Sequence, residues 1–335
     1  MDHQRRSLRI GAAVIGTAVV LRLLAGGWLA PLVEALTRPE TVAVLMYLET
    51  GRVVRPYSPM SYPPESPVPE MTGPAAQPPP VFSAEEGENL ELDNETGYDP
   101  NLTALLMTPL EWQLDDGVAR VLILHTHGSE SYTASAEDHY EESGDYRTLN
   151  EGYNMISVGE RVAQRLEAAG IRVVHDRSLH DYPSYNGSYT NARESIEAIL
   201  AREPGIRLIL DLHRDAAATE YGQMDTTAWI GGEEAAQLMI VVGTDDGGLY
   251  HPNWEENLAL AAKLQAQLER NYPGLCRPVN LCAQRFNGDE SPGALLIEVG
   301  AAGDTRQEAL RAAEALADGI IALARGANLT ADSTS

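Results

Sequence analysis

The chain has 335 residues, of which 49 are acidic and 24 basic, and its formal net charge is −25 at pH 7. Only one of the basic residues is a lysine, Lys263. This balance excludes the concentrated basic surface that nucleic-acid binding requires, so we expect no nucleic-acid partner. The length is sufficient for one large domain or two ordinary ones.

The first thirty residues carry the pattern of a membrane anchor. Three arginines between positions 5 and 9 precede an apolar run over residues 10–30, which matches the length of about 20 residues that a membrane-spanning helix needs. The arginines predict that residues 1–9 are cytoplasmic and that the remainder is exported. A cleaved signal peptide with residues 10–21 as its apolar core is the alternative. Because Pro31 directly follows the end of the run, we favour an uncleaved anchor.

Residues 31–104 are expected to form an extracytoplasmic spacer. The segment 55–80 is dense in proline, and an acidic tract follows over residues 84–100. Neither stretch has enough apolar surface to offset the entropy lost on ordering. We therefore predict a semi-rigid linker that holds the following domain away from the membrane.

From residue 105 the pattern is typical of an α/β domain, which we expect to end at residue 328 before a tail over 329–335. The predicted strands are 118–125, 171–176, 206–213, 237–243 and 294–300, and the predicted helices are 154–170, 191–203, 256–271 and 304–325. Strands that alternate with helices in this way indicate a single, mostly parallel sheet with helices on both faces.

Ionisable residues stand at the ends of three of these predicted strands. They are His125, His127, Glu130, Asp211, His213 and Glu298. In an open α/β sheet, ligands bind beyond the carboxyl ends of the strands. A glutamate that closes an apolar strand is costly to bury unless it is paired, protonated or near a metal. The pattern therefore places a functional site at these strand ends.

The residue types in this group predict a catalytic zinc site. Two imidazoles and one carboxylate, with a fourth position left open, form one of the known ligand sets of catalytic zinc. We expect His127, Glu130 and His213 to be the ligands. Glu298 is then the general base for the zinc-bound water, whose pKa the metal lowers to about 7.

Two alternatives stay open within this ligand set. His125 lies two residues before His127, and it either replaces Glu130 as a ligand or orients His127. Glu151, just before the predicted helix 154–170, is a rival carboxylate ligand.

Six stretches of the chain together resemble the stage II sporulation protein P family of cell-wall hydrolases. They are LILHTHGSESY, YNMISVGERVAQRLEAAGIRVVHD, YNGSYTNARESI, LILDLHRDA, VGTDDGGLYHPNWEENLALA and LLIEVGAAGDTRQEA, and they span about residues 118–313 in the family's order. The resemblance implies a zinc-dependent N-acetylmuramoyl-L-alanine amidase fold that acts on peptidoglycan, with cleavage of D,D cross-links as a second activity. It also implies action with stage II sporulation proteins D and M at the engulfing septum of the forespore.

The same resemblance assigns the four site residues. Its THxxESY stretch gives His127 and Glu130, its LHRDA stretch gives His213, and its LIEVG stretch gives Glu298. The chain departs from the family pattern at Gly288, where a glutamine is expected, so the substrate contacts of that loop stay open.

The cysteines, Cys276 and Cys282, are not a feature of the resemblance. In an exported protein they form either a disulfide or two free thiols.

Two other functions use the same residues. A His-x-His metal phosphoesterase or amidohydrolase would use His125 and His127 together, but at later strand ends the chain offers only Asp211 and His213 as further ligands. A non-catalytic, wall-binding scaffold of the same fold would have lost a ligand, and none is lost. We therefore predict hydrolysis of the amide that joins N-acetylmuramic acid to the L-alanine of the peptidoglycan stem peptide.

Overall fold

The computed structural model describes residues 82–109, 114, 117–136, 138–140, 145–219 and 222–331. All of them belong to one of the two compact units into which the chain divides, residues 73–335. The predicted cytoplasmic segment, the anchor and most of the spacer lie outside the described residues. Within the described part of the chain, no helix is long and apolar enough to cross a membrane.

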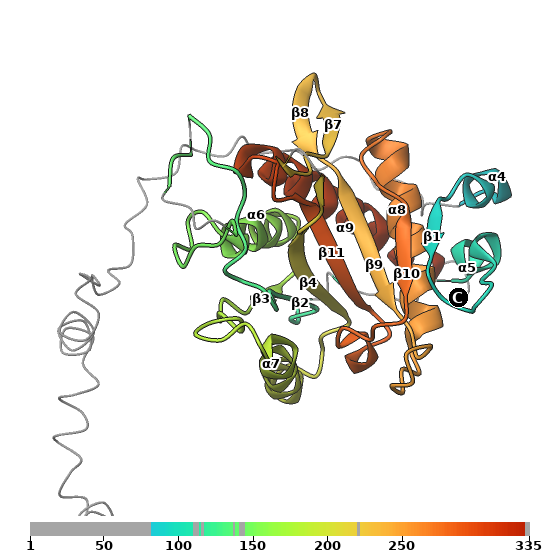
Figure 1. Ribbon diagram of the computed structural model, residues 1–335. Helices are drawn as coiled ribbons and strands as arrows, with labels where there is room; N and C mark the ends of the chain where they lie inside the picture. Colours follow the sequence, from blue (N-terminus) through green and yellow to red (C-terminus); the bar gives the residue numbers. More distant parts are fainter. Residues whose placement is uncertain are drawn as a thin grey trace, which may run out of the picture. The chain divides into compact units, whose positions relative to one another are not determined.

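Seven strands form one sheet in the order β1-β10-β9-β11-β4-β2-β3 (Figure 1). They are β1 (Leu92–Asn94), β2 (Val121–Leu124), β3 (Val173–His175), β4 (Leu208–Asp215), β9 (Leu238–Gly243), β10 (Val279–Cys282) and β11 (Ala294–Ala301). Every neighbouring pair is parallel except β9 and β11, which are antiparallel. The sheet therefore consists of two parallel blocks that meet at β11, and the prediction of a mostly parallel sheet is confirmed.

The other elements connect these strands. The long helices are α6 (Met155–Ala168), α7 (Ser188–Arg202), α8 (Trp254–Asn271) and α9 (Arg306–Ala331). The short ones are α4 (Ala84–Glu88), α5 (Leu102–Met107) and the 3-10 helix η1 (Gly288–Glu290). Two hairpins lie between β4 and β9, formed by β5 (Ala218–Thr219) with β6 (Gly222–Gln223) and by β7 (Thr227–Ile230) with β8 (Glu233–Ala236).

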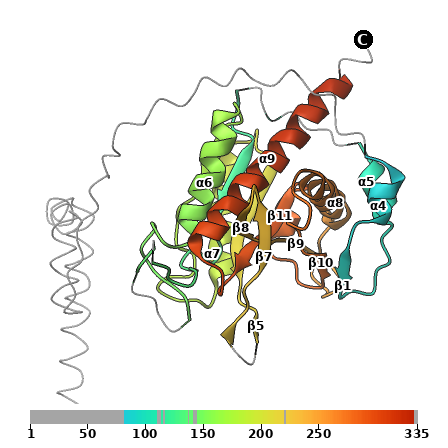
Figure 2. The same cartoon turned by 90° about the horizontal axis from the view of Figure 1, so that it is seen from above.

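Helices cover both faces of the sheet, as predicted. The main core lies on one face, where α6, α8 and α9 pack against side chains such as Ile123, Leu210 and Ile297. Helix α9 lies between α6 and α8 (Figure 2). On the opposite face, α7 packs with Ile196 against strand residues that include Leu122. Successive side chains of a strand point to opposite faces, which explains why each strand feeds both cores.

One part of the α7 face has a different cover. Val241, Cys282 and Leu296 form a third, small cluster, and only Met239 and Phe286 pack against it as partly buried apolar residues. These strands, β9, β10 and β11, stand in the foreground of Figure 1 with no long helix in front of them. Among the described residues, α7 therefore covers only the β2–β4 half of this face.

The structure corrects the predicted boundary between spacer and domain. Strand β1 pairs in parallel with β10, with Leu92 opposite Val279, and so it forms one edge of the sheet. Phe82 is buried in the main core, and the partly buried apolar residues that pack against that core include Leu90, Leu92, Leu102 and Leu105. Because these apolar side chains supply enough surface to bury, residues 82–104 belong to the folded domain and not to the linker.

Candidate functional site

The turn that carries the first two predicted ligands is fixed by a buried aspartate. Strand β2 ends at Leu124, and Thr126 then donates two hydrogen bonds to Asp211 of β4, from its backbone N (2.8 Å) and its Oγ1 (2.6 Å). Burial alone would raise the pKa of Asp211, but the neighbouring His213 imidazole and the Thr126 donors lower it to about 2. Asp211 therefore works as an ionised anchor for the turn that presents His127.

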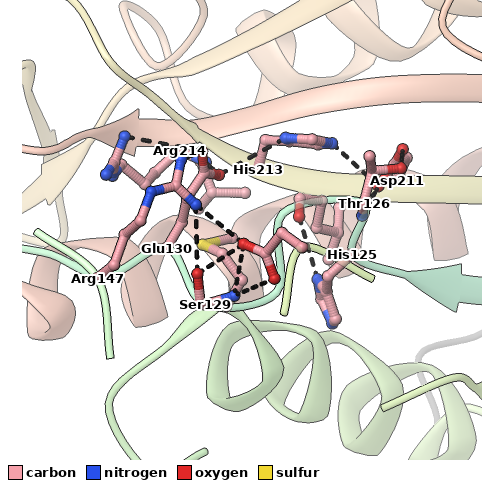
Figure 3. Close-up of polar contacts among 12 residues, drawn as sticks. His125, Thr126, Ser129, Glu130, Arg147, Asp211, His213 and Arg214 are labelled. Atoms are coloured by element: carbon pink, nitrogen blue, oxygen red, sulfur yellow. Dashed lines mark hydrogen bonds and ion pairs between the residues drawn. The ribbon is translucent and has the colours of Figure 1, made fainter. Parts of the chain in front are cut away.

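The three predicted zinc ligands lie together in the structure, and Figure 3 shows two of them, Glu130 and His213. Glu130 Oε2 is 3.6 Å from His213 Nδ1. The rings of His127 and His213 meet edge to face with centroids 5.2 Å apart. All three residues are buried. Two segments that lie more than 80 positions apart in the chain thus supply one cluster.

Glu298 joins this cluster from the neighbouring strand. It is the Cα partner of His213 in the β4–β11 pairing, so both side chains leave the same face of the sheet. Burial raises the pKa of Glu298 to about 8, and the charges of Glu130 and Asp215 act in the same direction. The predicted base therefore lies beside a predicted ligand.

The location of the cluster differs in one respect from the sequence prediction. Both β4 and β11 continue past the residues at which the predicted strands ended, to Asp215 and Ala301. His213 and Glu298 consequently lie on the face of the sheet, within the strands, and only His127 and Glu130 stand beyond a strand end.

Two arginines hold Glu130. Its Oε1 accepts a hydrogen bond from the Arg147 guanidinium (3.2 Å), and its Oε2 accepts one from the backbone N of Arg214 (3.3 Å). Arg147 also binds Asp181 (2.9 Å) and Ser129 (3.2 Å), which links this network to a second loop. Although burial opposes it, the neighbouring His213 and Arg214 lower the pKa of Glu130, so this carboxylate is ionised.

The donor types of the cluster fit zinc, but their present arrangement is not a coordination geometry. His127 Nδ1, His213 Nε2 and Glu298 Oε2 are buried without a hydrogen-bond partner. His213 Nε2 lies 3.0 Å from Asp211 Oδ1, at ion-pair distance, but in an orientation that does not make a hydrogen bond. Among the described residues, no group of three or more His, Cys, Asp or Glu side chains is set to hold a metal.

The structure separates His125 from His127. His125 Nδ1 lies 3.0 Å from the Leu212 carbonyl, and its Nε2 lies 3.0 Å from His175 Nε2. A Cβ on Gly159 of α6 would come within 2.5 Å of His125 Nε2, so this imidazole fills the space between β2 and α6. Burial lowers its pKa to about 3, and it is neutral. A His-x-His pair of ligands is therefore absent from this arrangement.

Glu151 also lies apart from the cluster. Its carboxylate accepts a short hydrogen bond from Arg177 (2.6 Å), and its side chain is 41% exposed. In this arrangement Glu130, and not Glu151, is the carboxylate next to His213.

Two tyrosines complete the surroundings of His127, Tyr185 in the loop before α7 and Tyr189 in the first turn of α7, and the sequence reasoning did not select them. Tyr185 stacks on the His127 ring with centroids 4.5 Å apart and an angle of 9° between the planes. Tyr189 meets the same ring edge-on at 5.5 Å. The Arg147 guanidinium lies 4.9 Å from the centre of the Tyr185 ring. The dense run of tyrosines in YPSYNGSY was the available signal.

Comparison with known proteins decides the family. The family described as stage II sporulation protein P matches residues 70–321. The chain belongs to this family. Stage II sporulation protein P of Bacillus subtilis (strain 168) is 31% identical over 261 residues, which cover 73% of this chain and 61% of that relative. The resemblance seen in the sequence is confirmed, and the chain spans less than two thirds of the length of this relative.

Solved structures of N-acetylmuramoyl-L-alanine amidases are also similar, at low identity. The amidase AmiC2 of Nostoc punctiforme is 18% identical with a TM-score of 0.37, and the match covers 60% of this chain and 94% of that one. The amidase from Clostridium difficile 630 is 17% identical with a TM-score of 0.37, covering 66% and 100%. The amidase Ami1 of Mycobacterium smegmatis is 14% identical with a TM-score of 0.36, covering 67% and 100%. TM-scores this low support no assignment of residues in this chain.

Proposed function

We propose that the chain is a peptidoglycan hydrolase of sporulation that cleaves the amide between N-acetylmuramic acid and the L-alanine of the stem peptide. The observation that carries the proposal is the convergence of His127, Glu130 and His213 beside Glu298, in a chain that belongs to the stage II sporulation protein P family. A carboxylate with one unpartnered buried oxygen, paired across the sheet with a buried imidazole, is suited to move a proton during hydrolysis.

The proposed ligands of zinc are His127, Glu130 and His213. When bound, zinc supplies Lewis acidity toward the amide carbonyl and toward water. Glu298 accepts the proton of the attacking water and donates it to the leaving amine, as a general base and then a general acid.

The surrounding residues position these groups. Asp211 fixes the turn after β2 through Thr126. The rings of Tyr185 and Tyr189 restrict the His127 imidazole to one orientation. Because reacting groups must be held close to their productive geometry, these contacts bear on the rate as well as on stability.

We also propose the location and partners of the enzyme. The apolar run over residues 10–30 would anchor the chain, with the domain outside the cytoplasm at the forespore septum. We further propose that the enzyme acts with stage II sporulation proteins D and M, a proposal in keeping with its membership of a sporulation family.

The test is digestion of purified peptidoglycan by the full chain in detergent, with added zinc or with a chelator, followed by mass analysis of the products. Zinc-dependent release of free stem peptides and of glycan without peptides is expected. Split D,D cross-links would add an endopeptidase activity. If zinc binds and no bond is cleaved, the proposal fails and the scaffold alternative replaces it.

A further inference from the structure

A row of three side chains crosses the sheet at the candidate site. His213 on β4 is paired with Glu298 on β11, and Glu298 is paired in turn with Met239 on β9. Paired residues of neighbouring strands point to the same face, with Cβ atoms about 5 Å apart. Met239 is thus the neighbour of Glu298 on the side away from the proposed zinc ligands, and it is partly exposed.

Met239 belongs to an apolar patch that adjoins Glu298. We define the apolar patch as Met239, Val241, Leu296 and Phe286, which pack together on the α7 face of the sheet. None of the described long helices contributes to this cluster. The unpartnered Oε2 of Glu298 lies at its border. The patch is therefore a continuation of the candidate site along the sheet.

A strained loop forms one side of the patch. Phe286 and Asn287 both have left-handed backbone conformations, with φ of 50° and 60°, which non-glycine residues seldom adopt. The Asn287 side chain donates a hydrogen bond to the Tyr189 carbonyl (2.9 Å), and the Phe286 ring lies 5.5 Å from the Tyr189 ring. Strain of this kind concentrates at functional sites, where the surrounding contacts maintain it.

A cation lies at the other end of this surface. Arg277 donates its backbone N to the carbonyl of Leu238, the residue before Met239. Its guanidinium reaches Asp215 Oδ2 at 2.7 Å. Asp215 follows His213 by two residues on the same face of β4, a distance of about 7 Å along the strand. The Arg277 side chain, 23% exposed, therefore reaches from its backbone contact with β9 to Asp215 of β4, two residues along that strand from the row that contains Glu298 and Met239.

Arg277 places a positive charge beside the candidate site of a chain that is acidic as a whole. The chain has a formal net charge of −25, so it repels an acidic ligand in general. A guanidinium has five N–H donors in a rigid fork and can bind a second carboxylate while it keeps Asp215. The partly exposed Met239, followed by a guanidinium, matches a peptide in which a small apolar residue precedes an acidic one.

We propose that the apolar patch and Arg277 bind the first two residues of the stem peptide, on the amine side of the scissile amide. Met239 contacts the side chain of the alanine next to the bond, and Arg277 binds the carboxylate of the acidic residue that follows. This inference rests on the proposed function, because it names the part of the substrate that this side of the site holds.

The experiment measures binding of a synthetic stem tripeptide, alanyl-glutamyl-lysine with the stereochemistry of the stem, to the full chain in detergent by calorimetry. A second peptide carries an amide in place of the free carboxylate of the glutamyl residue. The wild-type chain is expected to bind the free acid at least tenfold more tightly than the amide. Equal affinity for the two peptides, or no binding of either at millimolar concentration, would overturn the proposal.

Variants assign the effect to these residues. Arg277→Met is expected to weaken binding of the free acid at least tenfold and to remove the preference over the amide, and Arg277→Lys to restore part of it. Met239→Trp is expected to block both peptides. The control is Arg165→Met, which breaks an ion pair of similar length (Arg165 to Asp318, 2.8 Å) on the α6 side of the molecule. Thermal unfolding verifies that each variant folds.

The result separates this inference from the proposed function. If the peptides bind as expected and peptidoglycan is not cleaved, the hydrolase proposal fails and the binding site stands. If peptidoglycan is cleaved, and Arg277→Met changes neither peptide affinity nor KM, the binding site is wrong and the hydrolase proposal stands.

Discussion

At the scale of single residues, the most direct prediction concerns Glu298. Glu298→Gln keeps the size of the side chain and removes its ability to accept a proton. We expect kcat to fall by a factor of about 10² to 10⁴, the usual contribution of a general base, with zinc content unchanged. Metal analysis of the purified variant and turnover of a muropeptide check both parts. Glu233→Gln, at a carboxylate that is 68% exposed on the surface, is the control. Full activity of Glu298→Gln would remove this residue from the mechanism.

The choice between Glu130 and Glu151 is a second prediction at this scale. Each carboxylate is paired with an arginine, but only Glu130 lies beside His213. Glu130→Gln is expected to lower zinc affinity at least tenfold, and Glu151→Gln to leave it unchanged. Competition with a chromogenic chelator gives both dissociation constants. The opposite result would assign the third ligand to Glu151 and make the Glu130–Arg147 pair structural.

Tyr185 supplies a third prediction, because the Nδ1 of His127 has no hydrogen-bond partner to fix its orientation. The stacked Tyr185 ring takes over that role. Tyr185→Ala is expected to lower zinc affinity by about tenfold, which is at the lower end of the effect of losing an orienting contact. Tyr185→Phe is expected to keep the wild-type zinc affinity, because it keeps the stacked ring. Tyr182→Ala is the matched control, because Tyr182 is 50% exposed and Tyr185 is 56% exposed on the same loop. Equal losses in both alanine variants would contradict the stacking role.

Sequence reasoning found the ligand candidates because all of them follow or end apolar runs: His127, Glu130, His213 and Glu298. Burying an ionisable side chain at the end of an apolar strand costs free energy unless a partner or a metal compensates for it. The same reasoning could not find Arg147 or Asp181. Both lie in loops without periodicity, and their importance comes from contacts with Ser129 and Glu130 that only the folded chain brings together. Nor could it show that His125 points toward α6, since the turn after β2 breaks the strand alternation that the reasoning assumed.

At the scale of elements, the long helices were predictable and the short strands were not. Helix α6 has seven buried residues at helical spacing, and the side chain of Asn154 caps its start as expected. By contrast, β10 has only four residues, one of them the polar Asn280, and β1 lies within an acidic tract. Such strands are specified by their neighbours in the sheet and not by their own sequence. The cysteines, one in β10 and one before it, are both free thiols and form no disulfide.

Lys263, the only lysine of the chain, links helices α8 and α5. The prediction at the scale of elements concerns the loss of stability when this side chain is replaced. From α8 its Nζ donates hydrogen bonds to the carbonyls of Leu105 (2.7 Å) and Leu106 (2.8 Å) at the end of α5. Lys263→Met leaves both carbonyls without this donor, so we expect the free energy of unfolding to fall by about 1–3 kcal/mol. Urea unfolding measures the loss, and Arg165→Met is the control. An unchanged midpoint would show that water replaces the ammonium.

The same lysine gives this prediction a pH dependence. Burial lowers the pKa of Lys263 from its ordinary value of 10.5 to about 8. Between these values the unfolded chain binds more protons than the folded chain, so the contribution of Lys263 to stability rises with pH. A neutral amine still has two N–H donors for the two carbonyls. The difference between wild type and Lys263→Met should therefore be larger at pH 9.5 than at pH 7.

At the scale of the whole molecule, the architecture explains why the site lies where it does. The two parallel blocks of the sheet meet in the antiparallel pair of β9 and β11. Helix α7 covers only the β2–β4 side of its face. The row from His213 to Met239 therefore lies at the border between the part that α7 covers and a part against which none of the described long helices packs. Hydrophobic periodicity predicts that two faces exist, but the extent to which each is covered depends on loop paths that the sequence pattern does not encode.

The N-terminal boundary of the domain yields the last prediction. Without residues 82–104, the sheet loses β1, the edge of β10 is left unpaired, and the core loses Phe82 together with the α4 and α5 contacts to α8. An exposed strand edge promotes aggregation as well as instability. A fragment that starts at residue 105 should therefore unfold at a lower temperature than one that starts at residue 82, and it should aggregate on heating. Calorimetry and light scattering on the two fragments measure this, with a fragment from residue 73 as the control for length alone. Equal unfolding temperatures for the fragments from 82 and 105 would mean that residues 82–104, including β1, do not contribute to the stability of the domain.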